Sequence, residues 1–172
     1  AMRILKRMGF KPQRAIRLIL FDGEEYGLLG SRAYVRKHFG TKAVSTPEHG
    51  KVSAVFNLDA GAGRIRGIYL AGNTQAEPEL RRLLQPWKSE GSATIAHRYP
   101  GVGIYSDEVS FNFAGIPAFI FVQDPLDYWS RMHSTSDTFD KSWTPNLKHN
   151  AALIAWLALQ TANAKEKLPR RQ

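Results

Sequence analysis

The sequence predicts an α/β protein, a three-layer α/β/α sandwich with a mixed, mainly parallel sheet and helices on both faces. Apolar runs of strand length alternate with stretches of helical period along the chain, a pattern typical of strands joined by helices. Acidic residues directly follow two of these runs, at 22–25 and at 59. Ligands bind beyond the carboxyl ends of strands in open α/β sheets. The acids therefore lie where a site is expected.

The first elements follow from apolar spacing. Residues 2–8 place methionine and leucine on one stripe and predict the last turns of a helix that ends at Gly9. The apolar run 14–21 predicts a strand buried on both faces. A helix is expected over 31–38 and a second buried strand over 52–58.

Shorter elements are expected in the middle of the chain. Residues 65–70 alternate like a strand, and 93–98 form another candidate strand. Between them, 77–87 predict a helix with Pro78 in its first turn.

The last third combines one strand with one long helix. Residues 118–122 predict a core strand, followed by a long polar loop over 123–141. Apolar residues at helical spacing predict an amphipathic helix over 144–164. The domain is therefore expected to span 1–164, and the basic stretch 165–172 is expected to be a disordered tail.

Composition excludes several classes of function. The chain has 172 residues and no cysteine, so any metal must be held by His, Asp or Glu. Its net charge of +9 comes largely from basic residues near both ends, without interleaved aromatic residues, which disfavours a nucleic-acid partner. No run approaches the roughly 18 apolar residues of a membrane span. The first residues are too short and too charged for a signal peptide, so no targeting segment is expected.

The acids at the strand ends have two interpretations. Two consecutive glutamates in a tight turn, Glu24 and Glu25, cannot point the same way. One can therefore bind a metal while the other faces a metal-held water. Helix capping or a solvated turn is the alternative, and Asp59 alone is also typical of a turn.

Histidine is the next candidate ligand. His133 lies in a polar loop directly after the last core strand, whereas His38 and His149 sit at helix ends, where surface or capping roles are expected. His49 and His97 lie in loop or strand-edge positions, and nothing near them singles them out. The segment around Ser106 lacks the glycine spacing of a nucleophile elbow, and no glycine pattern matches a phosphate or dinucleotide loop.

Five motifs in order resemble the di-zinc exopeptidase family, which includes secreted bacterial aminopeptidases and a plasma glutamate carboxypeptidase branch. The similarity is greatest to the latter branch and covers almost the whole chain. The motifs are Arg-Leu-Ile-Leu-Phe-Asp-Gly-Glu-Glu-Tyr-Gly-Leu-Leu-Gly-Ser (17–31), Asn-Leu-Asp-Ala-Gly (57–61), Ser-Asp-Glu-Val-Ser-Phe (106–111), Gly-Ile-Pro-Ala (115–118) and His-Ser-Thr-Ser-Asp-Thr (133–138).

The resemblance implies roles for four residues. Glu24 matches the general base, and Glu25, Asp59 and His133 match zinc ligands. In the family, the matches of Glu25 and His133 share one zinc while the match of Asp59 holds the other. Zinc accepts nitrogen and carboxylate ligands, and two metals activate a bridging water and polarise the scissile carbonyl. The implied function is hydrolysis of terminal peptide bonds or dipeptides, with a peptide as substrate.

The chain also departs from the family pattern. Two further ligands of the family, a His and a bridging Asp, lie upstream of the Glu-Glu pair, and the 23 residues before Glu24 contain no His. We therefore expect an incomplete catalytic domain that lacks amino-terminal elements and is inactive or weakly active until an upstream segment completes it. Glu108 stands where many relatives have His, and Met132 where some have a catalytic Tyr. Tyr128 and Tyr105 are the candidate substitutes for that Tyr.

Two hypotheses of different class remain. The first is the carboxyl-terminal part of a zinc exopeptidase, for which the resemblance also implies a secreted or periplasmic location and leaves room for a homodimer. The second is a non-catalytic binding module on the same fold with an incomplete metal site. Retention of Glu24, Glu25, Asp59 and His133 favours the first, because a binding scaffold does not need all four.

Overall fold

The computed structural model describes residues 1–97, 106–141 and 144–171. Its described residues form a four-stranded sheet in the order β1-β4-β2-β3. Strand β1 pairs with β4 and β2 with β3 in parallel, while β2 and β4 run antiparallel. The sheet is thus mixed and mainly parallel, as predicted. The strands are β1 (Val55–Asn57), β2 (Ile65–Tyr69), β3 (Thr94–Ala96) and β4 (Ala118–Gln123).

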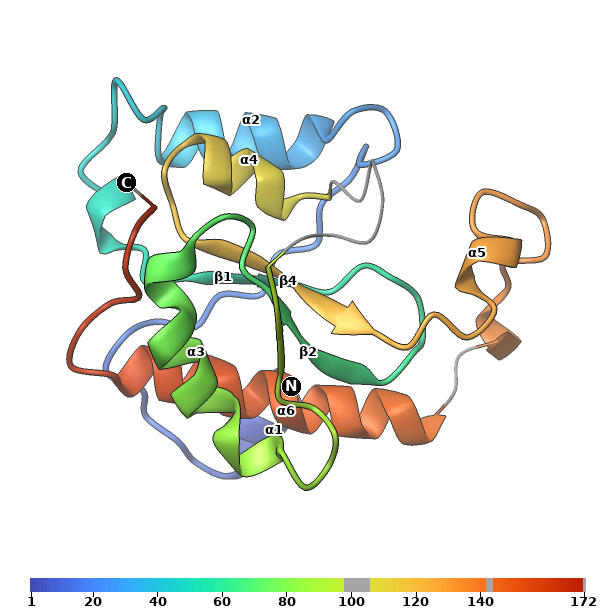
Figure 1. Cartoon of the computed structure of the whole chain (residues 1–172). Coiled ribbons are helices and arrows are strands. Elements are labelled where there is room, and N and C mark those ends of the chain that lie inside the picture. The colour runs from blue at the N-terminus through green and yellow to red at the C-terminus, as the bar shows by residue number, and fades with distance from the viewer. Residues whose placement is uncertain (98–105, 142–143, 172) are drawn as a thin grey trace.

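Helices cover both faces of this sheet (Figure 1). Helices α2 and α4 lie over one face, and α3 and α6 lie over the other, with α1 against α6. The predicted three-layer α/β/α fold is therefore confirmed. The α-helices are α1 (Met2–Arg7), α2 (Leu29–His38), α3 (Glu77–Leu84), α4 (Glu108–Phe113), α5 (Tyr128–Arg131) and α6 (Thr144–Asn163), and 3₁₀ turns span His49–Lys51, Thr74–Ala76, Gln85–Trp87 and Phe139–Lys141.

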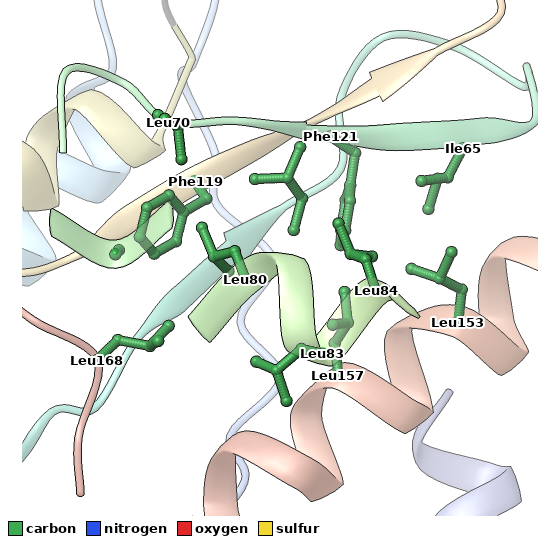
Figure 2. Close-up of a cluster of buried hydrophobic side chains, with 12 residues drawn as sticks. Ile65, Leu70, Leu80, Leu83, Leu84, Phe119, Phe121, Leu153, Leu157 and Leu168 are labelled. Atoms are coloured by element: carbon green, nitrogen blue, oxygen red, sulfur yellow. The ribbon is translucent and has the colours of Figure 1, made fainter. Parts of the chain in front are cut away.

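Strand β4 joins the two hydrophobic cores. Its residues point alternately to the two faces, so Ala118 packs beneath α2 and α4, while Phe119 and Phe121 pack towards α3 and α6. Figure 2 shows the larger of the two cores, in which these phenylalanines meet Leu80 of α3 and Leu157 of α6. Full burial of such side chains stabilises the fold by about 1.5–3 kcal/mol each.

A buried amide fixes the loop that follows β1. Asn150 of α6 is 2% exposed. Its Oδ1 accepts a hydrogen bond from the Ile65 backbone nitrogen at 2.8 Å, and its Nδ2 donates to the Gly63 carbonyl at 2.9 Å. Because buried polar groups stabilise only when they are paired, this side chain anchors the 59–65 loop to helix α6.

The prediction of a buried strand over 14–21 is wrong. The segment has no ladder partner among the described residues, and Leu18 and Leu20 are 66% and 88% exposed. Only Ile16 and Phe21 pack against hydrophobic clusters. An apolar run needs a neighbouring strand and two covering layers to be buried, and local sequence does not report whether these exist.

The second buried strand is shorter than expected. The range 52–58 narrows to Val55–Asn57, and these residues are only half-buried. Arg170 is one reason why the strand does not begin at Val52. Its guanidinium donates hydrogen bonds to the Val52 carbonyl at 3.2 Å and to the His49 carbonyl at 2.8 Å. The carbonyl of Val52 is therefore paired with a side chain.

The stretch 165–171 is not a disordered tail in this structure. Leu168 is 5% exposed and belongs to the larger core. The Pro169 carbonyl accepts a hydrogen bond from Asn73 at 2.7 Å, and Arg170 binds the Gly115 carbonyl at 2.7 Å. The prediction of disorder rested on the high charge of this stretch and gave no weight to its one buried leucine, Leu168.

Candidate active site

Backbone hydrogen bonds fix the Glu-Glu turn before α2. The amides of Gly27 and Leu28 donate to the Glu24 carbonyl at 3.0 and 2.9 Å, and the Gly30 amide donates to the Asp22 carbonyl at 3.0 Å. Leu28 precedes the helix with φ +61°, an uncommon conformation for a side chain of its size. These bonds hold the Glu24 and Glu25 side chains at the start of a helix.

His133 reaches this turn from a distant loop. Its Nε2 lies 2.8 Å from Glu25 Oε2, although the two residues are far apart in sequence. His133 itself has φ +59°. Strained backbone of this kind occurs at functional sites and persists only where the surroundings hold it in place.

Asp59 follows β1 and contributes negative charge to the same region. The pKa of Glu24 is raised above its ordinary 4.5, first by burial and then by the charges of Asp59, Glu25 and Asp107, with His133 opposing them. Neighbouring carboxylates disfavour ionisation of one another. The structure therefore brings all four predicted site residues into one electrostatic neighbourhood.

Tyr128 lies near the same group of acidic side chains. Burial raises the pKa of its hydroxyl, and the charges of Asp59, Glu25 and Glu24 raise it further. Its ring packs on Gly61, where an added Cβ would come within 2.8 Å of Tyr128 Cδ2. Of the two tyrosines considered from sequence, Tyr128 is placed near the acids, while Tyr105 lies outside the described residues.

The first turn of α4 adds a polar network that sequence reasoning missed. Asn57 Nδ2 donates to Glu108 Oε2 at 2.8 Å and to Ser106 Oγ at 2.9 Å, and Glu108 is fully buried. Asn57 precedes Asp59 by two residues, so this network fixes the strand end that carries Asp59. The signal in the sequence was the position of Asn57, two residues before the acid Asp59 at the end of a predicted strand.

Asp107 connects this network to helix α2. Burial and the charge of Asp59 raise the pKa of its carboxyl group, and the nearby Ser31 hydroxyl opposes this shift. The Ser31 and Ser110 hydroxyls lie 2.8 Å apart. Polar contacts thus link the helix after the Glu-Glu turn to the helix beside Asp59.

The remaining histidines have partners elsewhere. His49 Nε2 lies 2.6 Å from the Ala114 carbonyl, and His149 Nε2 lies 2.9 Å from Ser92 Oγ. His97 lies 3.4 Å from Glu77, and His38 packs on the ring of Tyr34. These contacts give each of the four histidines a structural partner outside the Glu-Glu turn.

The donor chemistry of the site fits zinc. Glu25 and His133 offer carboxylate oxygen and imidazole nitrogen at contact distance, and these are donors that zinc accepts. Asp59 provides a further carboxylate nearby. Over the described ranges, 1–97, 106–141 and 144–171, no three such side chains converge closely enough to enclose a metal.

A shallow groove of about 190 Å³ borders the site. Gly61 of the loop after β1 lies on one side, and Tyr128 and Met132 of the 125–141 segment lie on the other, with Leu147 of α6 completing the lining. It therefore runs between the segments that carry Asp59 and His133.

Comparison with known families decides the assignment. The model of peptidase family M28 matches residues 1–158. The chain belongs to peptidase family M28. This result confirms the resemblance inferred from the five sequence motifs and, with it, an exopeptidase lineage. Over the described residues, no helix has the length and apolar content needed to cross a membrane.

Curated relatives of this M28 chain include carboxypeptidase Q from several vertebrates. The chain is 29% identical to the Bos taurus protein over 176 residues, covering 99% of this chain and 34% of that protein. It is 27% identical to the Homo sapiens protein over 176 residues, with the same coverage of 99% and 34%. The chain therefore spans about a third of the length of these relatives.

Solved M28 structures share the fold. A peptidase M28 precursor from Shewanella amazonensis superposes with a TM-score of 0.78 at 30% identity, covering 95% of this chain and 35% of that one. The zinc aminopeptidase from Bacillus subtilis superposes with a TM-score of 0.66 at 28% identity, covering 95% and 39%. Both similarities extend over nearly all of this chain.

Proposed function

We propose that this chain is part of a zinc-dependent exopeptidase that cleaves a terminal peptide bond or a dipeptide. The observation that carries the proposal is the contact between His133 and Glu25 at 2.8 Å, beside Glu24 and within the field of Asp59. Membership of family M28 and a structural neighbour described as a zinc aminopeptidase support it. Glu25 and His133 would hold one zinc ion, and Asp59 the other.

The residues of the chain divide the chemistry between them. When bound, zinc supplies an activated water and polarises the scissile carbonyl. Glu24 is not a ligand in this scheme, so its carboxylate accepts a proton from the attacking water and returns it to the leaving amine. A raised pKa suits this shuttle, because a general base works best when its pKa lies near the operating pH.

We further propose that a segment outside these 172 residues completes the site. The relatives are about three times as long as the chain, which covers 34% of each. Leu18 and Leu20 expose their side chains on a segment that has no ladder partner in the described part of the chain, and an unpaired apolar segment is suited to pair with another strand. The segment would supply that strand together with further ligands.

Two substitutions test the division of roles in the active protein. Glu24→Gln should retain zinc while lowering the rate about 100-fold or more, the loss expected when a general base is removed. Glu25→Gln should weaken zinc binding itself. Equal loss of metal in both variants would contradict the assignment. Absence of both zinc binding and peptidase activity in the full-length wild type would instead favour the non-catalytic module with an incomplete metal site.

A further inference from the structure

One side-chain amide holds the loop that follows Asp59. Gln123 is the last residue of β4. Its Oε1 accepts a hydrogen bond from the Ala60 amide at 3.2 Å, and its Nε2 donates to the carbonyls of Gly61 and Gly63 at 2.9 and 3.0 Å. A primary amide has one acceptor oxygen and two N–H donors. The oxygen and the nitrogen of this side chain therefore both bind the same loop.

The strand pairing shows what this side chain replaces. The parallel ladder between β1 and β4 ends where Asn57 pairs with Ile120. Three residues further along each strand, a continued ladder would place Ala60 opposite Gln123. The backbone of Gln123 pairs with Ile65 on the other side, in β2. Its side chain thus takes over the link between the end of β4 and the loop from β1 to β2, which lie side by side (Figure 1).

These hydrogen bonds fix the backbone on the carboxyl side of Asp59. The Gly61 amide donates to the Asp59 carbonyl at 2.9 Å, and the Ala60 amide donates to Gln123. The peptide group between Asp59 and Ala60 thus has a partner for both its carbonyl and its amide. Rotation of this peptide group is restricted, and with it the direction in which the Asp59 side chain leaves the backbone.

The same loop forms the surface on which Tyr128 packs. Gly61 has φ +76°, and a Cβ there would come within 2.8 Å of Tyr128 Cδ2. A Cβ at Gly63 would come within 1.7 Å of the Asp124 carbonyl oxygen. Both glycines that Gln123 binds are therefore in close contact with the segment after β4. A shift of the loop would alter the packing of Tyr128 as well as the placement of Asp59.

We propose that Gln123 is a positioning residue for the exopeptidase reaction and acts through Asp59 and Tyr128, an inference that rests on the proposed function. Gln123 is half-buried and is not among the described residues that line the groove, so it would act through the loop. Groups that orient a metal ligand typically contribute about 10- to 100-fold to metal affinity or activity. Because Asp59 would hold one zinc ion and Glu25 with His133 the other, loss of these hydrogen bonds should weaken one zinc ion selectively.

Two substitutions of nearly equal size test this proposal in the full-length protein. Gln123→Met removes all three hydrogen bonds. Gln123→Glu keeps an acceptor for the Ala60 amide but loses both donors and places a negative charge beside two carbonyls. Titration with a competing chelator should show the affinity for one zinc ion lowered by about 10- to 100-fold and the affinity for the other unchanged.

Steady-state kinetics at saturating zinc give a second readout. Each Gln123 variant should lower kcat by about tenfold or more while KM changes little, because misplaced reacting groups raise the barrier of the chemical step. Gln85→Glu is the matched control, since it makes the same change at an exposed position of the 3₁₀ turn after α3. It should leave both zinc ions and kcat unchanged.

A second control separates positioning from general loss of stability. Leu168→Ala removes a side chain from the larger core and should destabilise the fold while leaving the two zinc affinities in their wild-type ratio. If Gln123→Met weakened both zinc ions equally, its effect would be a loss of stability, and the positioning role would be overturned.

Amide hydrogen exchange in the metal-free 172-residue chain needs neither zinc nor catalysis. Gln123→Met should speed exchange of the Ala60 amide by about tenfold or more, because an amide that loses its partner exchanges through local opening. The Ile65 amide, at the other end of the loop, is bound by Asn150. It is an internal control whose exchange should stay at the wild-type rate.

The outcomes separate the two proposals. Wild-type zinc binding and cleavage, with one-zinc affinity and kcat unaffected by Gln123→Met, overturn the positioning role and leave the proposed function standing. Absence of zinc binding and cleavage in the full-length wild type overturns the proposed function. In that case, faster exchange at Ala60 alone still supports Gln123 as the residue that fixes this loop. Exchange that is unchanged at Ala60, or equally faster at Ala60 and Ile65, overturns that role as well.

Discussion

Glu24 shows how neighbouring charges change the chemistry of one side chain. Burial contributes most to its raised pKa, followed by Asp59 and Glu25. A carboxyl group whose folded-state pKa is raised favours the folded state while it is protonated. This favourable contribution is present below the unfolded pKa and is lost as pH rises through the higher folded value. In the metal-free chain, ionised Glu24 therefore destabilises the fold.

Glu24→Gln should remove this pH dependence. In the metal-free chain, the variant should melt at a higher temperature than the wild type at pH 7, because it carries no charge in the acidic cluster. The difference should shrink towards pH 4, where the ordinary value of 4.5 leaves the unfolded group largely protonated. Thermal melting at both pH values measures it, and an advantage that grows as pH falls would contradict the sign.

Single residues also show what the sequence could and could not reveal about the site. Glu24, Glu25 and Asp59 were recognisable because they follow apolar runs, and an apolar run is a local property of the sequence. The contact between His133 and Glu25 joins distant segments and was expected only through the family resemblance.

At the scale of elements, the start of α2 positions the Glu-Glu turn through close backbone contact. A Cβ at Gly30 would come within 2.3 Å of the Asp22 carbonyl oxygen, which also accepts the Gly30 amide hydrogen bond at 3.0 Å. Helix and turn therefore approach each other only because residue 30 lacks a side chain. Any larger residue must push the turn outward.

Gly30→Ala should consequently destabilise the chain by about 1–3 kcal/mol, the usual cost of forcing extra atoms into a packed contact. Gly50→Ala is the matched control, since an added Cβ there meets nothing within 4 Å and should change stability by less than about 0.5 kcal/mol. Urea denaturation of both variants measures the difference. Equal effects would show that the Gly30 contact does not limit the position of the turn.

Elements were predictable where their signals were local. Helix α3 and strand β4 lie close to their predicted ranges, because amphipathic period and apolar runs are read within one segment. The segment 14–21 has the apolar composition of a core strand, yet Leu20 is 88% exposed. Burial of a strand depends on neighbours contributed by other parts of the fold, which composition does not encode.

At the scale of the whole molecule, the last residues close the larger core. Leu168 inserts between the layers at 5% exposure, and Arg170 binds three backbone carbonyls, at His49, Val52 and Gly115. The carboxyl end thus ties the sheet to the loop after α2. The sequence predicted disorder here because the average hydropathy of this stretch is set by its charged residues and not by its single leucine.

Leu168→Ala should cost about 2–4 kcal/mol of unfolding free energy, since it removes a buried leucine and leaves a cavity. Glu166→Ala, two residues earlier at an exposed position, should be nearly neutral. Chemical denaturation of the two variants compares them directly. A neutral Leu168→Ala would restore the expectation of a disordered tail.

The central claim is that Glu24, Glu25, Asp59 and His133 belong to a two-zinc exopeptidase site completed by a segment outside this chain. Zinc content after equilibrium dialysis tests it most directly, measured on the 172-residue chain and on the chain extended by the residues encoded before Ala1. Two tightly held zinc ions, and peptidase activity with them, should be present only in the extended protein. Two tightly held zinc ions and full activity in the 172 residues alone would contradict the account.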